Sequence, residues 1–319
     1  MAVPESSVTA VILTFNRVEE LLHTVAHMVR LDPPVPLIVV ANGCSDDTAS
    51  RMHASYPQVT LIELAENIGA AARNAGAAAA STPYVAFCDD DTWWEPGSMQ
   101  AAADTLDAYP GIAVLTARVV IEPEQREDPV CAVMAASPLV SVGLPGPAVI
   151  GFLAGACVFR RSNFLAVGGY EQRLFIGGEE ALLALDTVAR GGSIVYLDAL
   201  TVHHRPSRNR DARARRRLLA RNALWIAWLR RPLAPALQAT AAAIRLAATD
   251  ADALAGLWRA LLGMGWLVRK RRVVPRRVEA LWRQVESPAA NSVAMRPNSK
   301  RDVRPAATAL PAIGRQPGP

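Results

Sequence analysis

The first ninety or so residues alternate between short apolar runs and runs with helical spacing, and this order limits the fold more than any other feature. These apolar runs, the first of them rich in β-branched residues, predict buried strands at 8–15, 37–40, 59–64 and 84–88. The intervening runs predict helices at 17–31, 45–56 and 69–81. Strands and helices in this order predict an α/β fold with a doubly wound, mostly parallel sheet.

The alternation continues beyond these elements, with one interruption. We predict a helix at 96–109, a strand at 113–121, a helix over 177–190 and a strand at 193–197, after which residues 200–204 lead out of the domain. Residues 129–159 contain no charged side chain and are long enough to span a membrane. Pro138, Pro145 and Pro147 interrupt this segment, which favours a buried strand-and-loop region over a membrane span.

Charge is divided unevenly along the chain. Residues 1–200 hold 10 Arg and 23 Asp or Glu, a net charge of −13, whereas residues 201–319 hold 24 Lys or Arg and 6 Asp or Glu, a net charge of +18. The basic part therefore suits an anionic partner, or the acidic body itself. We predict an α/β domain at 1–210, a basic helical extension at 211–286 and a disordered tail at 287–319, where periodicity is lost.

The sequence lacks the motifs that mark several classes of protein. There is neither a GxGxxG after the first strand nor a P-loop, and no GxSxG, so dinucleotide, ATP and nucleophile-elbow chemistry are not indicated. The four cysteines form no CxxC pair, which argues against structural zinc and suits a reducing cytosol. The start of the chain lacks signal-peptide features, so we expect a cytoplasmic protein. The basic part carries no recognised nucleic-acid motif, and we expect no nucleic acid partner.

The strongest chemical signal is a run of three carboxylates, Asp89, Asp90 and Asp91, directly after the strand at 84–88. Functional groups gather at the carboxyl ends of strands in such sheets. Three adjacent carboxylates repel one another, and a divalent cation relieves that repulsion. Hard oxygen ligands favour Mg²⁺ or Mn²⁺, although the same run could form a solvated acidic turn that caps the next helix.

Three further groups could join this chemistry, and each also has a structural interpretation. Arg73, in an alanine-rich helix, could reach a diphosphate or pair with a carboxylate of the body. Glu179 and Glu180 follow two glycines at a helix start, which suits a general base on a mobile loop or acids that complement the helix dipole. His203 and His204 could complete a metal site or face solvent.

Six blocks of the sequence, in this order, resemble family 2 glycosyltransferases: VTAVILTFNR, LIVVANGCSDDT, ENIGAAARNAG, VAFCDDDTWWEPGSM, GFLAGACVFRRSNFLAVGGYEQRLFIGGEEALLALDTVARGG and IVYLDALTVHH. The resemblance covers roughly residues 8–230. It implies the GT-A fold and an inverting transfer of a sugar from a nucleotide diphosphate sugar, usually with Mg²⁺ or Mn²⁺. The expected reaction is a single displacement at the anomeric carbon by an acceptor hydroxyl.

The resemblance also implies roles for residues of the donor site. Thr14, Phe15 and Asn16 would line the nucleotide pocket, Asn42 would lie in the segment that contacts the base, and Arg73 would approach the nucleotide. The family usually has an acid immediately before the position of Asn42. Ala41 stands there in this chain, which bears on the choice of nucleotide.

The carboxylates and histidines receive roles by the same resemblance. Asp91 would be the direct metal ligand, and Asp89 would lie nearer the ribose while also belonging to the metal motif, with Asp90 in the nucleotide-sugar site. His203 and His204 match a position where some members place a histidine near the diphosphate. Glu180 stands where the family usually has the Asp that acts as base, which makes Glu180 the expected base and Glu179 the alternative.

The basic segment Arg213–Arg231 combines arginines with leucines and tryptophans, and is a candidate interfacial helix on an anionic membrane surface. In that case the acceptor could be a lipid-linked or cell-envelope saccharide, and the protein would be peripheral on the inner face of the plasma membrane. Packing of the tryptophans on the body is the alternative. Two other functions remain in competition: a sugar nucleotidyltransferase, and a non-catalytic sugar- or lipid-binding protein on a decayed transferase fold.

Overall fold

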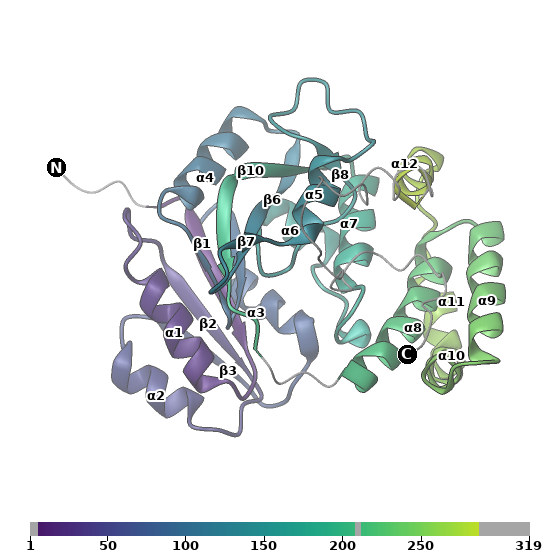
Figure 1. Cartoon of the computed structure of the whole chain (residues 1–319), viewed down its shortest axis with the longest axis horizontal. Helices are drawn as coiled ribbons and strands as arrows, with labels where there is room; N and C mark the ends of the chain where they lie inside the picture. Colours follow the sequence, from purple (N-terminus) through teal and green to yellow (C-terminus); the bar gives the residue numbers. More distant parts are fainter. Residues whose placement is uncertain (1–5, 208–211, 287–319) are drawn as a thin grey trace. The chain divides into compact units, whose positions relative to one another are not determined.

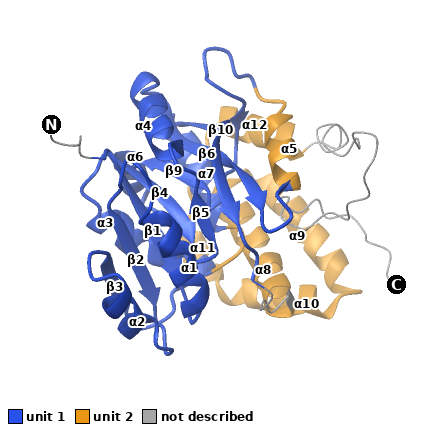
Figure 2. Cartoon of the chain, turned by 60° about the vertical axis from the view of Figure 1, so that its left-hand side comes forward, with its two compact units in different colours: residues 1–128, 140–175, 179–210 blue, residues 129–139, 176–178, 211–319 orange. Residues whose placement is uncertain are grey.

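The computed structural model describes residues 6–207 and 212–286, and the predicted tail at 287–319 lies outside the described residues. The chain divides into two compact units (Figure 2). Unit 1 comprises residues 1–128, 140–175 and 179–210, and unit 2 comprises residues 129–139, 176–178 and 211–319. This division differs from the predicted domains in two short segments, 129–139 and 176–178, which the sequence assigned to the first domain.

Unit 1 is built on one mixed sheet with helices packed against it (Figure 1). The main strand order is β3-β2-β1-β4-β9-β6-β10-β5, with β7 beside β6 and β8 beside β10. The β3-β2-β1-β4 half is parallel, as is the β6–β10 pair, whereas β9 runs antiparallel between β4 and β6. The strands are β1 (Val8–Thr14), β2 (Leu37–Asn42), β3 (Thr60–Leu64), β4 (Tyr84–Asp89), β5 (Thr92–Trp94), β6 (Ile112–Ile121), β7 (Arg126–Glu127), β8 (Ala148–Val149), β9 (Cys157–Arg160) and β10 (Ser193–His204).

The helices of unit 1 fall between these strands. They are α1 (Val18–Met28), α2 (Thr48–Ser55), the 3-10 helix η1 (Gly69–Ala72), α3 (Arg73–Ala79), α4 (Ser98–Ala108), α6 (Arg161–Val167), the 3-10 helix η2 (Gln172–Leu174) and α7 (Glu179–Ala189). Together with the mostly parallel sheet, they confirm the predicted α/β class.

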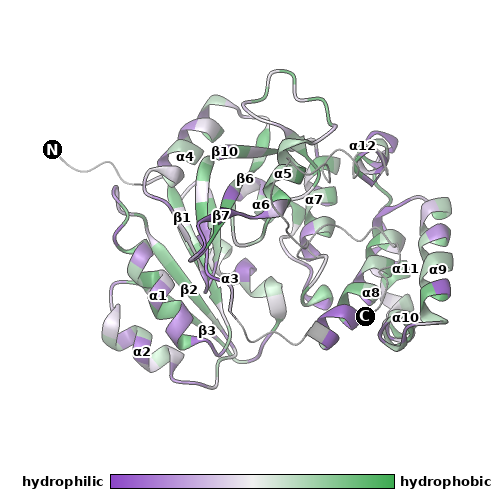
Figure 3. Cartoon of the chain, viewed as in Figure 1, coloured by the Kyte–Doolittle hydropathy of each residue, from purple (hydrophilic) through white to green (hydrophobic). Residues whose placement is uncertain are grey.

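The core lies in the sheet, where β1 and β2 are apolar along their length (Figure 3). Gly76 on α3 explains how closely that helix approaches the sheet. A Cβ at this position would stand 2.3 Å from Cγ1 of Val11 on β1, so only glycine fits without displacement. The small residues of the ENIGAAARNAG block therefore bring α3, and Arg73 at its start, close to the carboxyl ends of the strands.

Three predicted elements differ from the structure. The helix expected at 69–81 is divided into η1 and α3. Its first residue, Gly69, has φ +67 and lies against the carbonyl of Phe175, where a Cβ would not fit. The strand expected at 193–197 continues to residue 204, so β10 is longer than predicted and has an irregularity between Leu197 and Thr201. The segment at 129–159 also contains a helix, α5 (Pro129–Ala135), that its proline-interrupted pattern did not predict.

Unit 2 is helical, and its main helices follow residue 211. They are α8 (Ala212–Arg230), α9 (Leu233–Ala247), α10 (Ala251–Leu262), α11 (Met264–Lys270) and α12 (Arg276–Glu286). Gly256 of α10 packs directly on α8, where its Cα lies against Ala220. Asp252 pairs with Arg213, Arg216 and Arg217 of α8, so much of the helix's charge is used inside the unit. Among the described residues, none of the helices has the length and apolar character needed to cross a bilayer.

Candidate active site

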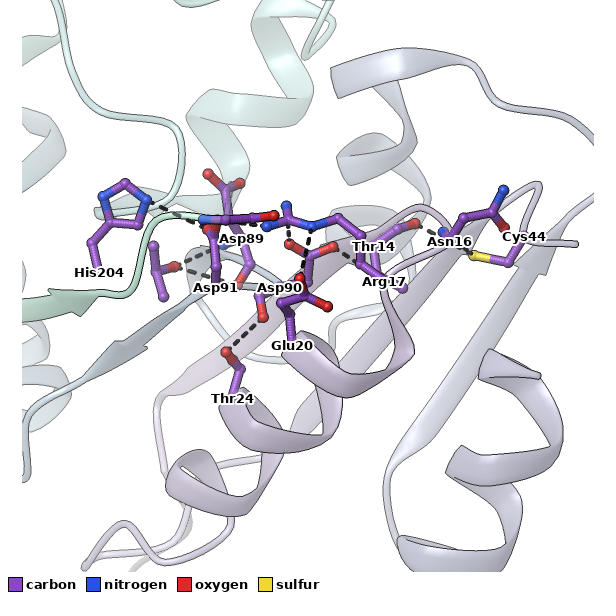
Figure 4. Close-up of polar contacts among 12 residues, drawn as sticks. Thr14, Asn16, Arg17, Glu20, Thr24, Cys44, Asp89, Asp90, Asp91 and His204 are labelled. Atoms are coloured by element: carbon purple, nitrogen blue, oxygen red, sulfur yellow. Dashed lines mark hydrogen bonds and ion pairs between the residues drawn. The ribbon is translucent and has the colours of Figure 1, made fainter. Parts of the chain in front are cut away.

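The three carboxylates lie at the junction of β4 and β5, next to the end of β1 (Figure 4). β1 and β4 are parallel and Leu13 is paired with Asp89, so Thr14 at the end of β1 faces the acidic run. The parallel register thus places the end of the first predicted strand beside the end of the fourth. Asp90 and Asp91 are buried, whereas the side chain of Asp89 is 42% exposed.

Arg17, at the start of α1, joins the two buried carboxylates. Its Nη1 lies 2.6 Å from Oδ1 of Asp90 and its Nη2 donates to Oδ2 of Asp91 at 2.8 Å. Burial lowers the pKa of Arg17, but the charges of Asp90 and Asp91 outweigh that effect and raise it. Arg17 is therefore a permanent cation whose guanidinium fork spans two adjacent carboxylates.

The pKa values of Asp90 and Asp91 are shifted in opposite directions. Burial raises the pKa of Asp90 to about 7, against the attraction of Arg17 and a hydrogen bond from Thr14 Oγ1 at 3.0 Å. Burial also disfavours the charge of Asp91, but His204 and Arg17 outweigh it and hold the pKa of that carboxyl well below its usual range. Asp91 is consequently the permanently charged carboxylate of the buried pair.

Asp89 faces a different cation. It forms an ion pair with Arg73, whose guanidinium is buried and lies 5.6 Å from the centroid of the Tyr170 ring. Burial lowers the pKa of Arg73, but the charge of Asp89 more than compensates and the pKa is raised. The side chain of Asp89 packs directly against Gly155. A Cβ at position 155 would stand 2.7 Å from Oδ2 of Asp89, so a larger residue there would displace the carboxylate.

Arg73 also connects the acidic run with the predicted base. The charges of Glu179 and Glu180, at the first turn of α7, act on Arg73 together with that of Asp89. Glu179 is buried and Glu180 is half-buried. The segment before α7 is tied to the segment before α3, because the N–H of Ala70 donates to the carbonyl of Phe175 at 2.7 Å. Both predicted base candidates thus lie within the electrostatic reach of the Arg73–Asp89 pair.

The two histidines point to opposite sides of β10, as neighbouring residues of a strand must. His204 turns toward the acidic run, with Nε2 3.6 Å from Oδ1 of Asp91. His203 lies beside Glu122, with Nδ1 2.7 Å from Oε1, and stacks on Trp93 at 5.6 Å between ring centroids. Trp93 is stacked on its other side by His27, so its ring is held inside the protein.

The other predicted donor-site residues surround the ends of β1 and β2. Phe15 is exposed, whereas Asn16 accepts the N–H of Ser45 at 2.7 Å and so ties the end of β1 to the loop after β2. Asn42 is buried and holds the segment before η1, since its Oδ1 accepts the N–H of Ile68 and its Nδ2 donates to Gly69. The structure therefore gives Asn42 a positioning role within the fold.

The residues at this site suit a small divalent cation in their chemistry. Asp91 supplies a charged carboxylate and Asp89 a partly exposed one, and carboxylate oxygens suit Mg²⁺ and Mn²⁺, while His204 places an imidazole beside Asp91. No three His, Cys, Asp or Glu residues within 6–207 and 212–286 already stand together as a ligand group. Of the four predicted metal ligands, the structure brings Asp91 and His204 together, while Asp89 pairs with Arg73 and His203 with Glu122.

Sequence reasoning did not single out Arg17, Gly155 or Tyr170. Arg17 stands directly after Asn16 in the first block of the resemblance, but a lone arginine at a helix start gave no sign of its partners. Gly155 lies in a segment with several small residues. The charge balance could have pointed to Arg17. Three carboxylates at a strand end need cations, and residues 1–200 contain only 10 arginines and no lysine to supply them.

The sequence model described as glycosyl transferase family 2 matches residues 9–163, which include β1, α3 and the acidic run. Residues 9–163, about half of the chain, belong to this family. Among curated proteins, it is 25% identical over 210 residues to the N-acetylglucosaminyl-diphospho-decaprenol L-rhamnosyltransferase of Mycobacterium tuberculosis. That match covers 54% of this chain and 67% of the relative.

Solved structures confirm the GT-A fold of this family 2 member. The mannosyltransferase PcManGT from Pyrobaculum calidifontis, in complex with GDP-Man and Mn²⁺, superposes with a TM-score of 0.54 at 18% identity, covering 91% of this chain and 86% of that one. Residues 1–349 of TarS from S. aureus give a TM-score of 0.53 at 18% identity, covering 89% and 87%. At these identities the likeness establishes the fold.

Proposed function

We propose that this family 2 glycosyltransferase moves a sugar from a nucleoside diphosphate sugar to an acceptor hydroxyl with inversion at the anomeric carbon. The observation that carries the proposal is the position of Arg73, a buried cation on which Asp89, Glu179 and Glu180 act together. A positive charge between an acidic strand end and two candidate bases suits a reaction in which negative charge builds on a leaving diphosphate.

The roles within the site follow from charge and burial. Asp91 and His204, with Asp89, would hold Mg²⁺ or Mn²⁺, which would supply positive charge for the leaving diphosphate. Arg73 holds Asp89 in place and keeps a fixed positive charge in the same region. Glu180 accepts the proton of the acceptor hydroxyl, with Glu179 as the alternative, because both carboxylates lie within the electrostatic reach of the Arg73–Asp89 pair and a carboxylate can act as general base.

We further propose a lipid-linked saccharide of the cell envelope as the acceptor. Support comes from the mycobacterial relative, whose name describes the transfer of L-rhamnose to a decaprenyl diphosphate-linked N-acetylglucosamine. The Mn²⁺ in the mannosyltransferase complex supports the use of a divalent cation. The donor nucleotide of this chain is best assigned by direct binding, since Ala41 replaces the acid that the family usually has before Asn42.

The first test is a thermal shift with Mn²⁺ and UDP, GDP or dTDP, using Asp91→Asn as the control. Ligand at about a hundred times its dissociation constant stabilises a native protein by roughly 2.7 kcal/mol. We expect one nucleotide to give a metal-dependent shift that Asp91→Asn loses. Equal shifts with and without Mn²⁺, or a shift retained by Asp91→Asn, would contradict the assigned metal ligand.

The second test separates the two candidate bases. Once the donor is known, we expect Glu180→Gln to lower kcat by roughly 100-fold or more while the thermal shift with nucleotide is kept. Glu179→Gln, one residue away on the same helix turn, is the matched control and should retain most of kcat. The opposite result would assign the base to Glu179, and full activity in both variants would remove both from the mechanism.

A further inference from the structure

Apolar side chains stand in solvent along α10 and α11 of unit 2. Leu254, Trp258, Leu261 and Leu262 recur at the spacing of one helix face, and Val268 continues the pattern on α11. Trp258 is 65% exposed, Leu262 73% and Val268 72%, values that neighbouring apolar residues of a folded core do not reach. We call these five residues the α10–α11 face.

The opposite side of α10 already supplies the packing of unit 2. Ala253, Gly256 and Ala260 are buried, and Gly256 lies against α8. The indole N–H of Trp225, on α8, donates to the carbonyl of Ala260 at 3.0 Å. The α10–α11 face is therefore additional to the core of the unit. An exposed apolar patch of this kind marks an interaction site more often than a structural one.

The charge around the face selects the kind of partner. Between residues 253 and 278 the sequence contains seven Arg or Lys and no Asp or Glu. Arg259, Arg269 and Lys270 are exposed on the same two helices. An ordinary protein surface mixes both signs of charge, whereas a one-sign basic segment around an apolar stripe with an exposed tryptophan is typical of helices that lie in the interface of anionic bilayers.

The structure also changes which helix is suited to such contact. The sequence predicted membrane contact through Arg213–Arg231. In the structure, Leu224, Trp225 and Leu229 of α8 are buried, and several arginines of α8 form ion pairs with Asp252. Its apolar side chains are therefore the core of unit 2 and are unavailable to lipid. The exposed apolar residues of the α10–α11 face begin two helices further along the chain.

We propose that the α10–α11 face binds the surface of a bilayer that contains anionic lipid, with Trp258 and Leu262 entering the acyl boundary and Arg269 and Lys270 at the headgroups. This inference goes beyond the proposed transfer reaction, because it holds for any acceptor. It would also bring the enzyme to the surface where a lipid-linked acceptor resides.

The test is flotation of the full chain with phosphatidylcholine vesicles, with and without 30% phosphatidylglycerol. We expect binding to the anionic vesicles at about 0.05 M salt and its loss at about 0.5 M, since screening is strong at that ionic strength. Trp258→Ser with Leu262→Ser should weaken binding at least about tenfold, because two exposed apolar side chains lose their burial. Arg269→Gln with Lys270→Gln should weaken it roughly thirtyfold, about fivefold per basic residue.

A matched control lies in unit 1. Val140 and Val142 are 80% and 92% exposed in a loop, so Val140→Ser with Val142→Ser removes similar apolar surface from another part of the chain and should leave vesicle binding unchanged. Donor hydrolysis without vesicles should be equal in all variants, which separates this proposal from the proposed reaction. The proposal is overturned if the wild-type protein does not bind anionic vesicles. It is also overturned if the protein self-associates in sedimentation and only Trp258→Ser with Leu262→Ser abolishes that self-association.

Discussion

Substituting Arg17 by Gln tests whether this side chain is the internal counter-cation of the acidic run. The guanidinium touches Asp90 and Asp91, whose side chains are 4% and 2% exposed, while Arg17 itself is 26% exposed. Removing one partner of a buried ion pair costs about 3–5 kcal/mol. Arg17 is partly solvated and Asp90, with a pKa of about 7, can take up a proton, so we expect a smaller loss of about 2–3 kcal/mol.

For a domain of this size, that loss corresponds to a Tm roughly 5–10 °C lower. We also expect Mn²⁺ to raise the Tm of Arg17→Gln more than that of the wild type, because a divalent cation can replace the lost positive charge beside Asp91. Both quantities can be measured by differential scanning fluorimetry over a Mn²⁺ titration. Equilibrium dialysis with Mn²⁺ should show correspondingly tighter binding by the variant in the absence of nucleotide.

Arg51→Gln is the matched control, because Arg51 also pairs with α1 through Glu19, but both side chains are solvent-exposed. Exposed ion pairs contribute little to stability, so this variant should have the Tm of the wild type. The reasoning is refuted if Arg17→Gln is no less stable than Arg51→Gln, or if Mn²⁺ affects the two variants equally.

Three further predictions concern packing and titration. Gly76→Ala should lower the free energy of unfolding by about 1–3 kcal/mol in urea titrations, because its Cβ would meet Val11 at 2.3 Å; an unchanged midpoint would contradict the packing of α3. Asn222→Ala should lower stability by roughly 1–3 kcal/mol, since its Nδ2 donates to the carbonyls of Ile176 and Gly177; circular dichroism during thermal unfolding would measure the loss. Asp252 hydrogen-bonds to Arg217 and other arginines of α8, which lowers its pKa to about 2. The stability it contributes should be present above the unfolded value near pH 4 and lost as the pH falls toward 2, so Asp252→Asn should differ from the wild type in Tm at pH 7 and match it near pH 2.

Much of unit 1 could be predicted from the sequence because the governing patterns are local. Short apolar runs predicted β1, β2 and β4, and the rule that functional groups gather at strand ends placed Thr14 and Asp90 at the same edge before any contact was known. The same reasoning could have separated His203 from His204, since neighbouring residues of a strand face opposite sides. The sequence prediction treated the two histidines as one group, and the structure divides them between Glu122 and Asp91.

The features that could not be predicted depend on contacts between distant segments. Arg17 meets its carboxylates only because β1 and β4 are adjacent and in register, a relation between residues more than seventy positions apart. Gly69 lies against the carbonyl of Phe175, a contact between distant segments that no local pattern reveals. The orientation of α10 depends on its packing against α8, and the sequence alone could not say which basic helix would keep its apolar side chains exposed.

The hydrogen bond between Ala70 and Phe175 has a consequence for the order of events in the reaction. Ala70 lies three residues before Arg73, and Phe175 lies four residues before Glu179, so one backbone link joins the segment that carries the buried cation to the segment that leads to the candidate bases. A donor that draws Arg73 toward its diphosphate would therefore shift the segment preceding α7 as well. On the proposed mechanism we expect the donor to bind before the acceptor, because a shift of this segment on donor binding would move the candidate base as well.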